Sequence, residues 1–139
     1  MPEHGSKCYG GSAGNTGIYV ASVPGRCFVS MNDEVCEVVI TGPNEDWVAT
    51  FTRQLVDDRL AACGHTINVI RSIYRWEDKV HDETEARVAL HTRRSLVSAI
   101  VDRANRDHPY DVPCVIAVSI VDGNAAYVDW ILQETAKGD

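Results

Sequence analysis

The chain has 139 residues, a formal net charge of −7 and 45% hydrophobic residues, which suits one domain with an ordinary core. An acidic chain without a basic stripe binds nucleic acid and anionic membranes poorly, so we expect neither as a partner. No apolar run approaches the roughly 20 residues that a membrane-spanning helix needs.

Residues 1–32 are rich in Gly and Ser and show no sustained period. They contain no charged segment followed by an apolar one, as a secretory signal would. We interpret residues 1–32 as a flexible N-terminal extension and expect the folded domain to cover residues 33–139.

The domain opens with a strand and a helix. The strand is predicted over Val35–Thr41, and Gly42-Pro43 ends it. Asn44 is a good helix N-cap, and the helix that it starts should run to about Ala62, where Gly64 permits it to stop. The helix has an apolar stripe that should face the sheet, formed by Val48, Phe51 and Leu55.

The next stretch predicts an unusually long hairpin. His65–Trp76 has no Gly or Pro and many β-branched and aromatic residues, so it indicates a strand about twice the usual length. Glu77–Lys79 supplies the turn, and Glu83–Thr92 alternates as a returning strand. Its buried face should hold Thr84, Ala86, Val88, Leu90 and Thr92. Because an unsupported hairpin is marginal in water, we expect this arm to pack on another copy of the chain.

A second helix is predicted over Arg93–Asp107, and Pro109 ends it. A strand over Cys114–Val121 and a last helix over Ala125–Thr135 follow. The order is βαββαβ with an extra C-terminal helix, which predicts an α+β, ferredoxin-like fold with one antiparallel sheet and a long central hairpin.

Four motifs in this order make the chain similar to the CutA family of divalent-cation-tolerance proteins, over about Val35–Thr135. The resemblance implies the fold above and a tight homotrimer in which long hairpins wrap the neighbouring subunits. It also implies a role in divalent-metal tolerance, with copper as the first candidate. The motifs are Arg-Leu-Ala-Ala-Cys over 59–63, Ile-x-Ser-x-Tyr-x-Trp-Glu-x-Lys-Val over 70–80, His-Pro-Tyr-x-x-Pro over 108–113 and Tyr-x-x-Trp-Ile over 127–131.

Cys63 and His65 are the candidate metal ligands. They lie two apart where the chain becomes extended, so both side chains should point to one side. A thiolate beside an imidazole is a plausible half-site for Cu(II), Zn or another divalent cation. The alternative is that Cys63 is buried as a small core residue and only His65 is exposed.

Two further groups are candidates for a pocket or an interface. His108, Tyr110 and Asp111 either border a pocket at a subunit boundary or simply pin the entry to the next strand. Trp76 and Lys79, at the hairpin tip, either line an inter-subunit pocket or make a plain oligomer contact.

His91 and Cys114 depart from the family pattern, in which Lys and Glu are common at these positions. They either supply softer ligands for copper or zinc, or reflect drift in a non-catalytic pocket. The number of cysteines is odd, at five, and no two of them are separated by the two residues of a CxxC motif. The sequence therefore indicates neither a disulfide framework nor a zinc knuckle. Cys36, Cys63 and Cys114 have apolar neighbours typical of buried thiols, and a reducing, cytoplasmic location is the simpler expectation.

The sequence contains no phosphate loop, nucleophile elbow or dinucleotide fingerprint, so we do not expect an enzyme. The leading hypothesis is a cytoplasmic homotrimer that binds divalent metal ions and contributes to metal tolerance. The alternatives are a trimeric signalling module that binds a small ligand between subunits, and a structural trimer that anchors a partner.

Overall fold

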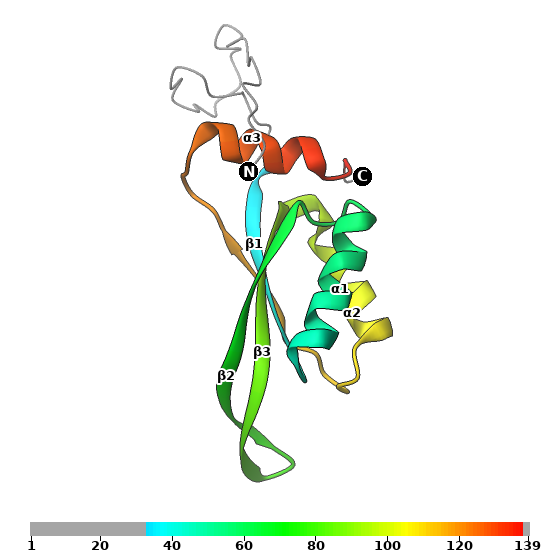
Figure 1. Ribbon diagram of the computed structural model, residues 1–139, viewed down its shortest axis with the longest axis vertical. Coiled ribbons are helices and arrows are strands. Elements are labelled where there is room, and N and C mark those ends of the chain that lie inside the picture. The colour runs from blue at the N-terminus through cyan, green and yellow to red at the C-terminus, as the bar shows by residue number, and fades with distance from the viewer. Residues whose placement is uncertain (1–32, 138–139) are drawn as a thin grey trace, which may run out of the picture.

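The computed structural model describes residues 33–137, and the predicted extension over residues 1–32 lies outside them. The described chain folds into four strands, three α-helices and a short 3-10 helix (Figure 1). In chain order they are β1 (Val35–Gly42), α1 (Glu45–Asp57), β2 (Cys63–Trp76), β3 (Lys79–Arg93), η2 (Arg94–Leu96), α2 (Val97–Asp107), β4 (Val115–Ser119) and α3 (Ala125–Glu134).

The four strands form one sheet in the order β2-β3-β1-β4, and every neighbouring pair is antiparallel. This is the α+β, ferredoxin-like arrangement that the order of elements predicts. Helices α1 and α2 lie on the same side of the sheet, and α3 crosses the end opposite the hairpin tip (Figure 1).

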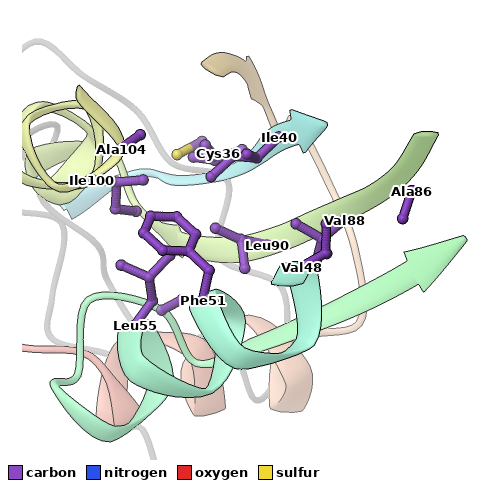
Figure 2. Packing of buried hydrophobic residues seen from close by; sticks show 12 residues of the cluster. Cys36, Ile40, Val48, Phe51, Leu55, Ala86, Val88, Leu90, Ile100 and Ala104 are labelled. Atoms are coloured by element: carbon purple, nitrogen blue, oxygen red, sulfur yellow. The ribbon is translucent and has the colours of Figure 1, made fainter. Parts of the chain in front are cut away.

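The main core lies between the sheet and the helices α1 and α2 (Figure 2). Alternate residues of β1 and β3 point into it, because successive side chains of a strand face opposite sides. The helix stripe over Val48, Phe51 and Leu55 is buried as predicted. Four of the five residues predicted for the inward face of β3 are buried. The fifth, Thr84, is exposed, because it lies on the arm beyond the helices.

The predicted end of the first helix was wrong. α1 ends at Asp57, and Arg59 takes the left-handed conformation (φ 60°) that we assigned to Gly64. Gly64 instead lies inside β2, where a Cβ atom would meet Thr52 Cγ2 of α1 at 2.5 Å. Glycine therefore allows α1 to pack closely on β2.

The hairpin is longer than predicted, with 14 residues in β2 and 15 in β3. Its turn is only Glu77 and Asp78, both at positive φ, and Lys79 already belongs to β3. Two successive residues with positive φ fit the twist of a tight hairpin. The outer half of the arm extends beyond the helices (Figure 1). It leaves large apolar side chains exposed, among them Ile73 (64%) and Val80 (63%).

Helix α3 builds a second, smaller core on the other face of the sheet. Asn124 caps the helix by accepting a hydrogen bond from Ala126 N, as its position before the helix predicts. Val128 and Ile131 then pack with Val35 of β1. Strand β4 is shorter than predicted, because its pairing with β1 covers only Val115–Ser119.

Candidate functional site

Cys63, His65 and His91 converge on the sheet face opposite α1 and α2. Cys63 starts β2, His65 lies two residues further on, and His91 of β3 is the cross-strand partner of Cys63. The Cys63 Sγ atom and one ring nitrogen of each histidine lie within 4.8 Å of one another. Cys63 and His91 are half-buried, and His65 is exposed. The structure therefore brings together a thiol and two imidazoles at a solvent-accessible position.

A register shift between Asn68 and Ile70 creates this pairing. In the outer arm Trp76 pairs with Lys79, and that register, continued inward, would place Cys63 opposite Thr92. Thr92 is fully buried and donates to the backbone of the loop after α1. The shift by one residue instead places Cys63 opposite His91, because side chains of strand partners share a face. The position of this register shift could not be predicted from the alternation of apolar and polar residues.

Tyr127 and Glu37 complete the surroundings of the cluster. Tyr127 at the start of α3 places its hydroxyl 3.2 Å from Cys63 Sγ and in contact with His91 Nδ1. Glu37 of β1 pairs across the sheet with His91, and its Oε2 lies 2.9 Å from His91 Nε2. Each ring nitrogen of His91 thus has a defined neighbour, so its ring is held toward Cys63.

These contacts shift the pKa values of the cluster. The hydrogen bond with Cys63 is the main cause that raises the pKa of His91, and Glu37 adds to it against the opposing effect of burial. Burial raises the pKa of Cys63, but hydrogen bonds with His91 and Tyr127 outweigh it and lower the pKa overall. Burial and the Cys63 hydrogen bond raise the pKa of Tyr127. The arrangement therefore favours a thiolate beside an imidazolium, with Tyr127 as a neutral donor.

The other predicted site residues lie elsewhere. His108 is buried: Nε2 lies 2.8 Å from the Thr41 carbonyl oxygen, and Nδ1 accepts from Tyr110 N. These contacts are consistent with the strand-pinning alternative, and His108 does not line the cavity of the second group of residues. Lys79 is exposed at the hairpin tip. Cys114 is also exposed, so its predicted burial was wrong, because it lies in the loop before β4.

Trp76, Tyr110, Asp111 and Cys114 share a second location, a cavity of about 530 Å³ between the hairpin and the loop before β4. Glu85 of β3 also lines it and accepts a hydrogen bond from the Tyr110 hydroxyl at 2.9 Å. The predicted residues thus separate into two groups: His91 joins Cys63 and His65, whereas Cys114 belongs to the cavity.

Sequence reasoning missed Tyr127 and Glu37. Tyr127 belongs to one of the four family motifs, but its helix is distant in sequence from Cys63 and nothing local indicates the contact. Glu37 is a lone acidic residue within an apolar strand, which was the available signal that this position faces a polar neighbour.

An α+β protein whose long hairpin carries a cluster of sulfur and imidazole donors falls in the class of candidate metal-binding proteins. The family model described as CutA1 divalent ion tolerance protein matches residues 36–134. The chain belongs to this family, whose description names ion tolerance and no catalytic activity.

The relatives and solved structures agree with this assignment. Human protein CutA is 39% identical over 101 residues, which cover 73% of this chain and 56% of that protein. The chain thus spans little more than half the length of the human relative. The divalent-cation tolerance protein CutA of Thermus thermophilus is 36% identical over 98 residues, or 70% of this chain and 95% of that protein. The crystal structure of CutA1 from Oryza sativa superposes with a TM-score of 0.74 at 33% identity, covering 78% of this chain and all of that one.

The names of the relatives refer to more than one compartment. A relative from Arabidopsis thaliana is called chloroplastic, and a structure from Archaeoglobus fulgidus is called periplasmic. Within residues 33–137, no helix has the length and apolar character to cross a membrane.

Proposed function

We propose that the chain forms a homotrimer that binds divalent metal ions, copper first, at Cys63, His65 and His91. Its role would be in tolerance of or response to such ions, in a reducing compartment such as the cytoplasm. The observation that carries the proposal is the convergence of one sulfur and two imidazole donors within 4.8 Å. The tolerance named for the family supports the same function.

The donor set fits copper or zinc better than calcium or magnesium. Thiolate and imidazole are the ligands that these borderline and soft ions select, whereas calcium and magnesium select oxygen. The lowered pKa of Cys63 favours the thiolate, which is the ligand form of cysteine. The raised pKa of His91 means that a metal ion must displace a proton from its ring on binding.

Glu37 would act through His91. A carboxylate on the second ring nitrogen of a ligating histidine fixes its tautomer and makes it a better donor. Glu37 Oε2 lies 2.9 Å from His91 Nε2, while His91 Nδ1 faces Cys63 Sγ at 3.8 Å. The Tyr127 hydroxyl also contacts this Nδ1, so a bound ion would compete with Tyr127 for His91.

The apolar surface of the chain supports the homotrimer. On β4, Ile116 and Val118 are each 55% exposed on the sheet face away from α1 and α2, and the outer arm adds Ile73 and Val80. Side chains of this size are normally buried in a core or an interface. Packing between copies would cover them, as the family resemblance implies.

Calorimetric titration of Cu(II) into the full chain tests the metal site. We expect saturable binding that Cys63→Ala, His65→Ala and His91→Ala each weaken at least about tenfold, and that Glu37→Gln weakens by about tenfold or more through its effect on His91. Zn(II) titrated in parallel removes the complication of copper-driven thiol oxidation, since zinc has no redox chemistry.

Two matched variants control for nonspecific effects. Cys114→Ala removes an exposed thiol outside the cluster, and His81→Ala removes a hairpin histidine whose ring contacts the Trp76 carbonyl oxygen. Both should bind Cu(II) and Zn(II) like the unmodified chain. Unchanged affinity in folded Cys63→Ala, checked by circular dichroism, would rule out the proposed site.

A further inference from the structure

The cavity beside the hairpin is separate from the cluster of Cys63, His65 and His91. Its volume of about 530 Å³ lies within the range of small-molecule sites. The hairpin contributes one wall, and the loop before β4, over residues 109–114, contributes the other. All of the described lining residues come from one chain.

Aromatic rings dominate the walls. Tyr74 and Trp76 come from the end of β2, and Tyr110 comes from the opposite loop. Tyr74 and Trp76 are 38% and 41% exposed, which is high for rings that usually seek burial. These rings offer apolar area and electron-rich faces, which attract an apolar molecule that carries a positive charge.

The charged side chains that line the cavity are both acidic. Glu85 and Asp111 line it, and the described lining residues include no Lys, Arg or His. Glu83 lies close by, and its Oε2 accepts a hydrogen bond from the Tyr74 hydroxyl at 2.6 Å. One histidine lies beside the lining: the His81 ring stacks on Tyr74 with the ring centroids 5.1 Å apart, and its Nδ1 lies 3.9 Å from Glu83 Oε1. Burial is the largest cause that raises the pKa of Tyr110, and Glu85, Tyr74 and Glu83 raise it further. Tyr110 therefore stays a neutral phenol that donates its hydrogen bond to Glu85.

Glu85 is the central polar group. Only 9% of its surface is exposed, and its Oε2 accepts one hydrogen bond, from Tyr110. A buried carboxylate is costly unless a charge or several donors compensate it. One tyrosine hydroxyl is modest compensation, so a cationic N–H donor in the cavity would satisfy Glu85 further.

We propose that this cavity binds a small organic cation, a protonated primary amine carried on an apolar group. The ammonium lies against Glu85 and near Asp111, and the apolar group packs between Trp76, Tyr74 and Tyr110. A metal ion suits the cavity less well, because two carboxylates, one already hydrogen-bonded, leave most of its coordination to water. The aromatic walls would then have no role.

Calorimetric titration of 2-phenylethylamine into the full chain at neutral pH tests the proposal. The matched neutral probe is 2-phenylethanol, which has nearly the same size and lacks the charge. We expect saturable binding of the amine and at least tenfold weaker binding of the alcohol. Equal binding of the two probes, or no saturable binding of the amine at millimolar concentration, would overturn the proposal.

Three variants locate the amine. Glu85→Gln keeps the shape of the side chain and should weaken amine binding at least tenfold, and Asp111→Asn, at an exposed position, should weaken it severalfold. Asp102→Asn on the exposed face of α2 removes the same charge outside the cavity and should leave binding unchanged. If Glu85→Gln does not fold, Asp111→Asn against Asp102→Asn decides the question, and equal affinity in these two would overturn the proposal.

The metal titration keeps this inference separate from the proposed function. Glu85→Gln and Asp111→Asn should bind Zn(II) like the unmodified chain, because neither residue contacts the cluster at Cys63. Loss of amine binding with retained Zn(II) binding would assign the cavity its own ligand.

Discussion

At the scale of residues, Cys63 and Cys36 show how contacts set the chemistry of a thiol. Burial raises the pKa of Cys36 to about 11, with Arg94 as a smaller opposing influence. Cys63 is also partly buried, but its hydrogen bonds with His91 and Tyr127 lower its pKa. Burial thus favours the protonated thiol at Cys36, and the hydrogen bonds favour the more nucleophilic thiolate at Cys63.

This difference predicts a pH-dependent selectivity in the metal-free protein. As pH falls, a thiol with a lowered pKa keeps its thiolate longer, whereas a thiol with a raised pKa loses it first. At neutral pH iodoacetamide should therefore modify Cys63 well before Cys36, as measured by peptide mass spectrometry. His91→Ala should move the pH profile of Cys63 toward that of an ordinary thiol. A profile that His91→Ala leaves unchanged would contradict the proposed thiolate–imidazolium pair.

Gly64 connects the packing of the fold to the position of the cluster. It faces α1, whereas Cys63 and His65 on either side of it point to the opposite face. A side chain at residue 64 would push α1 away from β2, since its Cβ would lie 2.5 Å from Thr52 and 3.0 Å from Leu90.

Gly64→Ala should accordingly lower the free energy of unfolding by about 1–3 kcal/mol, because overpacking a filled core is destabilising. Urea denaturation measures the change. Gly123→Ala is the matched control, since a Cβ there would meet Val128 at an ordinary 3.7 Å. A Gly64→Ala variant as stable as Gly123→Ala would show that α1 does not need this close approach.

At the scale of elements, the existence and length of the hairpin were predictable from the sequence, but the register between its two strands was not. The absence of Gly and Pro from His65 to Trp76 indicated its length. The register shift near Val69 had no signal, because β-branched residues continue through it. That shift decides that Cys63 meets His91, so the composition of the metal cluster was predictable only in part.

The exposed outer arm makes a prediction about assembly. Ile73 and Val80 would each gain about 1.5–3 kcal/mol from full burial between subunits. Light scattering at micromolar concentration should report a trimer for the full chain, and Ile73→Ser with Val80→Ser should shift it toward smaller species. Arg53→Ser, at an exposed position on α1 away from the hairpin and β4, should leave the trimer intact. A monomeric, folded chain would contradict the homotrimer.

At the scale of the whole molecule, local signals predicted the order of elements and the helix-facing residues. Asn44 and Asn124 cap their helices, and the stripe ending at Leu55 is buried. Contacts between distant segments were not predictable in the same way. Tyr127 reaches Cys63 only because α3 crosses the end of the sheet, and Glu85 faces a cavity only because the loop before β4 turns toward the hairpin.

The most direct test of the metal cluster is X-ray absorption spectroscopy of the full chain loaded with about one equivalent of copper. We expect sulfur scattering from Cys63 together with imidazole scattering from His65 and His91. The sulfur signal should vanish in Cys63→Ala and persist in Cys114→Ala. A copper ion with only nitrogen and oxygen neighbours in the unmodified chain, or a sulfur signal that survives Cys63→Ala, would contradict it.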